Sequence, residues 1–420
     1  MSAPLTVDRR GLWAPLASRP FRLLVAARVV DVLGNAVAPV ALAFAVLDLT
    51  GSATDLGLVV GARSVTNVVL LLFGGVLADR VSRHVLLVGS SLAAAVTQGV
   101  VAALVLTRTD SIGLLAAMSA LNGAVSAFAF PAAAALQPQT VPRAHLQQAA
   151  ALAQMGVSAA GVLGASLGGV LVAAVGPGWG IAADAVSFLL AAALFARIHL
   201  TARATTTGQA TVWRELATGW AEFRSRTWLW AVVTAFLLIN AVLAGGTGVL
   251  GPLVADRSFG RATWGLILAV HAAGTIVGGV IALRLRIHHL LLYGMACVAA
   301  EALFTLALGL TPPVGIIATA ALLGGLGVQQ FDIAWNTSVQ QHVPADRLAR
   351  VYSWDMLGSF VAIPLGQTLA GPLAAAVGTR PTLVSGSILI VLATAGALLP
   401  ASVRQLRNTA LDVAPSADAG

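Results

Sequence analysis

A short stretch at residues 75–84 reads Gly-Val-Leu-Ala-Asp-Arg-Val-Ser-Arg-His and lies where one long apolar run, residues 56–78, gives way to the next, residues 85–106. Each run is long enough to cross about 30 Å of hydrocarbon as an α-helix, which rises about 1.5 Å per residue. Two such helices joined by a short charged turn form a hairpin that suits a lipid bilayer. This stretch therefore predicts a helical membrane protein.

The same pattern continues along the whole chain. Hydrophobic residues make up 58% and charged residues only 10% of the 420 residues, whereas a soluble domain has about 25% charged residues. The apolar segments do not alternate with polar residues as the strands of a membrane barrel do. The chain is expected to be an all-α polytopic membrane protein with twelve transmembrane helices. These are predicted at residues 21–47, 56–78, 85–106, 112–136, 146–175, 181–198, 228–254, 264–283, 290–310, 314–339, 348–377 and 382–399.

The basic residues are distributed unevenly between the two sides of such a protein. All 24 are arginines, and the net charge is +8. With a cytoplasmic N-terminus, 18 of them fall in cytoplasmic segments, and the outer loops hold only Arg108, Arg257, Arg261 and Arg380. Cytoplasmic loops are enriched in Lys and Arg, so both termini are predicted in the cytoplasm and the protein in the cell membrane. A basic face toward anionic lipid explains the charge, and no nucleic-acid partner is expected.

The two halves of the chain resemble each other at an offset of 202 residues. Residues 164–176 and 366–378 share eight of thirteen positions, and Gly123 aligns with Gly325. An offset across six spans keeps the orientation, so this is a parallel repeat, which is a transporter architecture. We expect two six-helix bundles, residues 1–200 and 227–403, and a disordered cytoplasmic tail at 404–420. Residues 201–226 form a cytoplasmic linker in which Trp213, Trp220 and Phe223 recur at helical spacing, which predicts an amphipathic surface helix.

Enzymatic chemistry has no sequence support. We find no phosphate-cradling loop with Lys followed by Ser or Thr, so ATP is not expected to supply the energy directly. Cys297 is the single cysteine, which excludes an intrachain disulfide and a cysteine-cluster metal site. We therefore expect a protein that is not an enzyme and that uses neither cofactor nor metal.

Residues 75–84 resemble the signature loop of the major facilitator superfamily, Gly-x-Leu-Ala-Asp-Arg-x-Gly-Arg-Arg/Lys, and depart from it at Ser82 and His84. With twelve spans and a parallel repeat, the resemblance covers nearly the whole chain. It implies that Gly75, Asp79, Arg80 and Arg83 form a gating loop, with Asp79 held at the cytoplasmic start of the eleventh span. The arginines have a second interpretation as ordinary charges that set the topology.

The fifth span also resembles a superfamily motif, the antiporter sequence Gly-x-x-x-Gly-Pro-x-x-Gly-Gly. Gly164, Gly168 and Gly169 match it, whereas Ala160 and Ala165 replace Gly and Pro. The resemblance implies an exporter-type hinge at these glycines, and the alternative is close helix packing by small residues. Short fragments elsewhere are similar to the bacterial subgroup that includes macrolide-efflux proteins and the enterobactin exporter.

Ionisable groups inside a span are costly and are functional candidates by default. Asp31 lies near the middle of the first span, and Arg28 and Asn35 share its helix face at spacings of three and four. Arg63 and Asn67 lie four apart in the second span. These residues are candidates for one polar cluster that lines the substrate cavity, with Asp31 as a proton-coupling group. A static salt bridge between the two spans is the alternative.

The tenth span offers a second group. Asp332 shares a helix face with Trp335 and Asn336, and the resemblance implies that the first, fourth, seventh and tenth spans line the central cavity. Asp332 is therefore the other proton-coupling candidate, and Trp335, Asn336 and Phe128 are substrate-cavity candidates. An aromatic ring can stack on an amphipathic or cationic molecule, but it can equally be core packing.

Three further ionisable residues lie inside spans, and the resemblance makes the spans of Asp184 and Glu301 peripheral. We expect Asp184 near the membrane interface, Glu301 hydrogen-bonded to a neighbour, and His271 as a packing residue, with proton shuttling as the alternative for His271.

Together these features predict a proton-coupled antiporter that exports amphipathic small molecules such as drugs, macrolides or siderophore-like compounds by alternating access. Its partners would be the small-molecule substrate, protons and membrane lipids, and it would act as a monomer. The alternatives are a dedicated carrier or importer of one metabolite or lipid, or a receptor that transports nothing. The sequence leaves open the substrate, the transport direction, the coupling ion, and the protonation states of Asp31 and Asp332.

Overall fold

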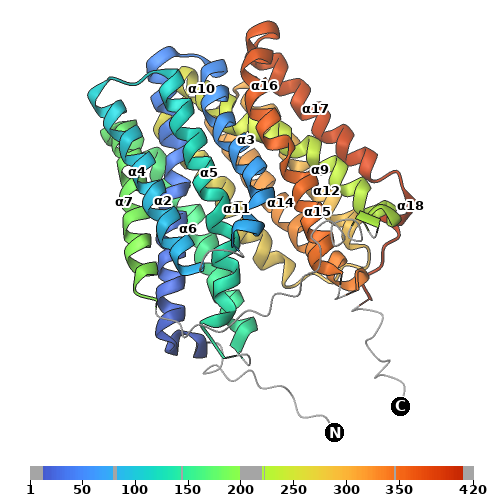
Figure 1. Cartoon of the computed structure of the whole chain (residues 1–420). Coiled ribbons are helices and arrows are strands. Elements are labelled where there is room, and N and C mark those ends of the chain that lie inside the picture. The colour runs from blue at the N-terminus through green and yellow to red at the C-terminus, as the bar shows by residue number, and fades with distance from the viewer. Residues whose placement is uncertain are drawn as a thin grey trace, which may run out of the picture. The chain divides into compact units, whose positions relative to one another are not determined.

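The computed structural model describes residues 13–78, 83–142, 145–198, 220–221, 223–344 and 347–409. Every regular element in these ranges is a helix (Figure 1). A helix satisfies all its backbone hydrogen bonds internally, as a chain surrounded by hydrocarbon requires. The elements are η1 (Ala14–Ala17), α2 (Arg19–Thr50), α3 (Ala53–Ala78), α4 (Arg83–Thr107), α5 (Ile112–Leu136), η2 (Gln137–Gln139), α6 (Leu146–Val175), α7 (Pro177–Ala196), α9 (Thr227–Gly245), η4 (Gly246–Leu250), α10 (Gly251–Ser258), α11 (Arg261–Ala282), α12 (Leu290–Val298), α13 (Ala300–Leu310), α14 (Val314–His342), α15 (Leu348–Phe360), α16 (Ala362–Val377), α17 (Thr379–Ala397) and α18 (Ala401–Arg404).

The helices follow the predicted apolar runs. In the described part of the chain, eleven helical segments are long and apolar enough to cross a membrane. The second predicted run corresponds to α3, a helix of 26 residues. Three runs consist of consecutive helices: α9, η4 and α10 form the seventh, α12 and α13 the ninth, and α15 and α16 the eleventh. The fold is therefore an all-helical polytopic membrane fold.

The sequence repeat is visible in the backbone. Gly176 separates α6 from α7 with φ +91°, and Gly378, 202 positions later, separates α16 from α17 with φ +96°. Only glycine adopts such angles without steric strain. The same tight connection thus recurs between the last two long helices of each half, which explains why both positions are glycine.

The chain divides into two compact units. The first contains residues 1–51 and 58–205, and the second contains residues 52–57 and 206–420. In the first unit α2 packs against α6 and α7, and α4 packs against α5 and α7. In the second unit α14 packs against α11, α12 and α13, and α9 packs against α16 and α17. Aromatic residues of α9 and α14 contribute to the core of the second unit, with Trp228 and Trp335 in edge-on contact.

Repeat-related glycines make matching contacts inside each unit. A Cβ atom at Gly123 of α5 would overlap with the Arg63 carbonyl of α3, and one at Gly325 of α14 would overlap with the His271 carbonyl of α11. Small residues let helix backbones approach closely in membranes. Because Gly123 and Gly325 are repeat-related, their contacts give Arg63 and His271 matching places in the two units.

Part of the predicted linker and tail is described. Trp220 and Phe223 stack on each other with ring centroids 5.8 Å apart, and Trp220 also packs against Trp354 of α15. Most of the predicted amphipathic helix, Trp213 included, lies outside the described residues. At the other end of the chain, the side chain of Asn408 donates a hydrogen bond to the Ile287 carbonyl. Residues 404–409, which we expected to be disordered, are therefore tied to the second unit.

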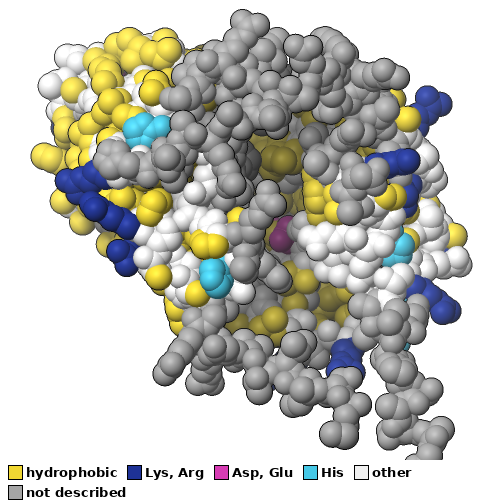
Figure 2. Space-filling model, turned by 60° about the horizontal axis from the view of Figure 1, so that its bottom comes forward, with side chains coloured by type: hydrophobic (Ala, Val, Ile, Leu, Met, Phe, Trp, Pro, Cys, Tyr) yellow, Lys and Arg dark blue, Asp and Glu magenta, His cyan; other side chains and the backbone are white. Residues whose placement is uncertain are grey.

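Figure 2 shows one face of the molecule with side chains coloured by type. Apolar and arginine side chains are prominent among the coloured atoms of this face, and acidic side chains are scarce. This appearance matches a composition in which arginines outnumber acidic residues by 24 to 16. The cytoplasmic location of the arginine-rich loops remains a prediction from the sequence.

Candidate functional site

A cavity with a mostly apolar wall lies inside the first unit. Its volume is about 240 Å³, and its wall includes Arg28, Asp31 and Asn35 from one face of α2 and Ser90 and Ser91 from α4. The three α2 residues share this face because residues three and four apart lie above one another on a helix. The predicted Arg28–Asp31–Asn35 face is thus directed into the interior of the bundle.

Arg63 of α3 joins this group. Its Nη2 donates a hydrogen bond of 2.6 Å to Oδ1 of Asn35, and the charges of Asp184 and Asp31 both act on its guanidinium. Arg28 and Arg63 both act electrostatically on Asp31. Within the described residues no group donates a hydrogen bond to the Asp31 carboxylate. Asp31 therefore lies at a cavity wall within electrostatic reach of two arginines.

Asp184 of α7 is a part of this cluster that the sequence interpretation placed elsewhere. We expected it near the membrane interface, but it is fully buried. Gln98 of α4 donates a hydrogen bond of 2.6 Å to its Oδ2, and Ser187 lies one turn further along α7. Gly34 of α2 makes room for both, because a Cβ there would overlap with Ser187 and crowd Asp184. The available signal in the sequence was Gln98, a polar residue in the middle of the third span, which could serve as a partner for a carboxylate.

The remaining first-unit candidates lie around this cluster rather than inside it. Asn67 donates a hydrogen bond of 3.2 Å to the Gly123 carbonyl and so links α3 to α5. Arg28 is 3.4 Å from the side-chain oxygen of Gln137. Phe128 is half-buried on α5. Asn67 therefore acts as a connection between helices next to Arg63, and the ring of Phe128 retains some accessible surface.

The glycines of the predicted hinge hold α6 against the helix that carries Asp31. Gly164, Gly168 and Gly169 are all buried. A Cβ at Gly164 would overlap with the Leu33 carbonyl and press on Ala36, and one at Gly168 would lie 3.1 Å from the Cα of Val37. The described contacts are those of close helix packing, and they fix α2 at the level of Asp31 and Asn35.

In the second unit Asp332 and Asn336 form a pair on α14. Nδ2 of Asn336 lies 3.1 Å from Oδ1 of Asp332, and the hydroxyl of Tyr352 donates to Oδ1 of Asn336 over 3.2 Å. Asp332 is exposed. The sequence correctly placed these two α14 residues together, while the contribution of Tyr352 from α15 depends on tertiary packing.

Trp335 has a different environment from the one expected of a stacking surface. Its side chain is only 6% exposed and packs between Trp228 and Phe331. The indole N–H donates a hydrogen bond of 2.9 Å to Oδ2 of Asp355. Trp335 therefore belongs to the core behind the Asp332 pair and holds Asp355, a residue that the sequence interpretation left without a committed role.

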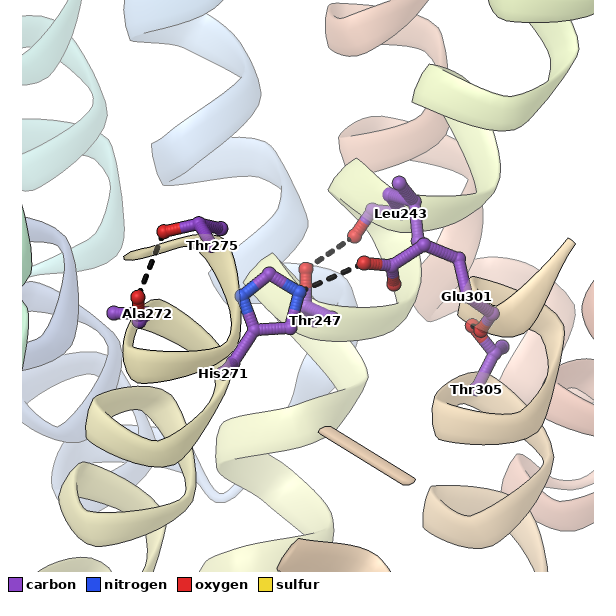
Figure 3. A network of polar contacts seen from close by, with 7 residues as sticks. All are labelled: Leu243, Thr247, His271, Ala272, Thr275, Glu301 and Thr305. Carbon is purple, nitrogen blue, oxygen red and sulfur yellow. Dashed lines mark hydrogen bonds and ion pairs between the residues drawn. The ribbon is translucent and has the colours of Figure 1, made fainter. Parts of the chain in front are cut away.

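His271 and Glu301 meet in the second unit. Nε2 of His271 on α11 lies 2.7 Å from Oε1 of Glu301 on α13 (Figure 3). Glu301 is only 1% exposed. The expected hydrogen bond of Glu301 to a neighbour is present, and the neighbour is the histidine that we had assigned to packing.

The predicted gating loop is described only at its ends. Gly75 belongs to α3, and Arg83 is the first residue of α4. Asp79 and Arg80 lie outside the described residues. Their role as a latch stays a prediction.

Comparison with protein families agrees with the sequence and the fold. The model of the Major Facilitator Superfamily matches residues 24–366. The chain belongs to the major facilitator superfamily and is a transporter of that family. A curated relative, the uncharacterized MFS-type transporter YvqJ of Bacillus subtilis (strain 168), is 24% identical over 289 residues, which are 66% of this chain and 68% of the relative.

Solved structures with similar folds come from transporters with different cargoes. The nucleoside transporter NupG aligns with a TM-score of 0.73 at 11% identity over 90% of this chain and 98% of its own. A bacterial homologue of the lysosomal transporter Spinster gives 0.69 at 16% identity, covering 92% and 98%. A bacterial homologue of the iron transporter ferroportin gives 0.71 at 15% identity, covering 90% and 98%. At these identities the likeness shows the fold alone.

Proposed function

We propose that this transporter is a proton-coupled antiporter that exports amphipathic small molecules from the cytoplasm, with Asp31 as the group that exchanges protons. The observation that carries the proposal is the position of Asp31 at the wall of the 240 Å³ cavity, between the charges of Arg28 and Arg63. The protein would work as a monomer in the cell membrane, with both termini in the cytoplasm.

The coupling follows from charge balance at this cluster. An ionised Asp31 offsets part of the positive charge of Arg28 and Arg63. A proton taken up from outside neutralises the carboxylate and leaves the two arginines with less compensation. Binding of a cationic or amphipathic substrate near Asp31 is then weaker, because a substrate and a proton draw on the same negative charge. A carboxylate buried among arginines is thus suited to exchanging a proton for a substrate.

Movement of the two six-helix halves would give the site alternating access to the two sides of the membrane. In parallel-repeat transporters one six-helix bundle rocks against the other around a central site. The Asp79 loop would hold one end of that movement, and Asp332 with Asn336 would provide the polar groups of the second unit. The packing of Gly164 and Gly168 on α2 would transmit a shift of α6 directly to Asp31.

The test measures proton movement in inside-out membrane vesicles with a dye whose fluorescence is quenched by a pH gradient. The panel of added compounds contains erythromycin, ethidium and enterobactin. We expect at least one compound to relieve the quenching in wild type, and Asp31→Asn to abolish the response because an amide carries no exchangeable negative charge. Asp48→Asn is the matched control, since it makes the same change at the far end of α2.

The outcomes separate the alternatives. A response that survives in Asp31→Asn but disappears in Asp332→Asn assigns the proton to the second unit and overturns the role of Asp31. The absence of any response from correctly folded wild-type protein contradicts multidrug antiport and favours a dedicated carrier with another coupling ion.

A further inference from the structure

The His271–Glu301 pair joins a partly exposed imidazole to a buried carboxyl group, and the proposed function gives it no task. In Figure 3 the imidazole of α11 points toward the carboxylate of α13, and Thr247 of η4 appears beside the ring. The η4 segment is a short π-helix that runs past α13, since a Cβ at Gly246 would lie 3.8 Å from Thr305. Such π segments inside α-helices are rare and occur frequently at functional sites.

The backbone of α14 closes the third side of the pair. A Cβ at Gly324 would lie 3.0 Å from Oε1 of Glu301, and one at Gly325 would overlap with the His271 carbonyl. Two adjacent glycines therefore give the carboxylate and the α11 backbone the space they occupy. Because any larger residue would displace the pair, its geometry is built into the packing of three helices.

No other charge compensates this pair among the described residues. Phe304 of α13 is an uncharged neighbour, with its ring centroid 5.6 Å from that of His271. Cys297, one turn before Glu301, is hydrogen-bonded to Tyr293. Charged groups on the packed elements lie at least two helical turns along the chain from the pair. They are Asp256 and Arg257 on α10, Arg261 on α11, Asp332 on α14 and Arg380 on α17.

His271 in the second unit corresponds in position to Arg63 in the first. Gly325 contacts the His271 carbonyl as its repeat mate Gly123 contacts the Arg63 carbonyl, so the two cations have matching places. Arginine stays protonated in proteins, whereas imidazole, with an ordinary pKa of about 6.5, changes charge near neutral pH. The cation of the first unit is thus permanent, and that of the second unit can be switched off.

We infer that the His271–Glu301 pair is a second proton-binding site of the transporter, separate from Asp31. With the proton bound, imidazolium and carboxylate neutralise each other. When the proton leaves to solution, Glu301 becomes a buried anion without a cation, which is strongly unfavourable. The second unit must then rearrange α11 against α13 or recover the proton. This inference rests on the proposed function for its place in the transport cycle, but not for the titration itself.

The deciding experiment follows the histidine ring directly. Protein labelled with ¹⁵N-histidine in lipid nanodiscs is titrated by NMR from about pH 5 to about pH 8.5, the range in which imidazoles change charge. The resonance that disappears in His271→Gln identifies His271. We expect it to change from the charged to the neutral form within this range, and its midpoint to differ between wild type and Glu301→Gln.

Two results would overturn the inference. A His271 resonance that keeps one charge state throughout the titration excludes proton exchange, and a midpoint unchanged in Glu301→Gln excludes the pair as the unit that binds the proton.

Vesicle measurements then place the site in the cycle. With whichever of erythromycin, ethidium or enterobactin moves protons in wild type, His271→Arg is expected to lose part of the proton release per molecule transported. His289→Arg makes the same change outside the pair and should retain it. Equal proton release in His271→Arg and wild type would overturn the coupling role. If wild type responds to none of the compounds, the proposed antiport fails while the NMR titration still decides the proton site.

Discussion

The first and second units place a cation at matching positions and surround it in different ways. Arg63 hydrogen-bonds Asn35 and interacts with two carboxylates, Asp31 and Asp184, beside a cavity. His271 instead faces a single carboxylate, Glu301, in a closely packed site. The same position in a duplicated fold therefore holds an arginine in one half and a histidine in the other. Duplication preserved the packing glycines and left the ionisable side chains free to diverge.

Removal of the first-unit cation should have the largest effect on stability. Arg63→Met leaves Asp31 and Asp184 without this compensating charge and Asn35 without its donor. Removing one partner of a buried ion pair costs about 3–5 kcal/mol, and this range sets an upper limit for the loss of stability. We expect about 3 kcal/mol, measured as a lower unfolding temperature of the purified protein in detergent. Adding Asp184→Asn should restore part of the loss, and an Arg63→Met protein as stable as wild type would contradict the cluster.

The repeat-related glycines test whether the two units really share their packing. Gly164→Ala and Gly366→Ala each insert a methyl group against a backbone carbonyl, of Leu33 and of Ala241 respectively. Overpacking of this kind costs about 1–3 kcal/mol, so we expect similar losses of about 2 kcal/mol in unfolding measurements on both variants. Gly99→Ala has open space around it and should be neutral or slightly stabilising. A loss in only one of the two variants would show that the packing of the repeat has diverged.

An exposed ion pair in the second unit provides the smallest effect. Asp256 and Arg261 are 2.7 Å apart, the same distance as His271 and Glu301, but the Asp256 side chain is 33% exposed whereas that of Glu301 is only 2% exposed. Surface pairs contribute about 0–1 kcal/mol. Arg261→Ala should therefore lower the free energy of unfolding by about 0.5 kcal/mol, and high salt should lower the stability of this variant little further. A loss as large as that of Arg63→Met would show that distance rather than burial determines the strength of these pairs.

Prediction from the sequence succeeded where a local pattern was sufficient. Length and hydrophobicity of the apolar runs located the helices, and the 202-residue offset anticipated the matched connections at Gly176 and Gly378. The proximity of Arg28, Asp31 and Asn35 followed from helical spacing within one element. The pairing of Arg63 with Asn35 was expected only in general terms, as a cluster between two neighbouring spans.

The sequence interpretation failed where a contact joins helices distant in the chain. Asp184 looked peripheral because its depth in the span gives no information about Gln98, which lies 86 residues earlier and bonds it. For Trp335 the sequence left open a stacking surface or core packing, and Trp228 and Phe331 pack against it in the core. Helix spacing identifies the residues of one face but does not identify the helix that covers that face.

By itself the sequence determined that this chain is a helical, duplicated membrane protein of a transporter superfamily, because hydrocarbon requires long apolar helices and the repeat preserves glycines where backbones touch. The tertiary structure alone decided which ionisable groups share an environment. Asp31 lies at a cavity with Arg63 nearby, and His271 meets Glu301 across two helices. The physical reason is that buried charges require partners, and the partner of each is supplied by whichever helix the packing places opposite.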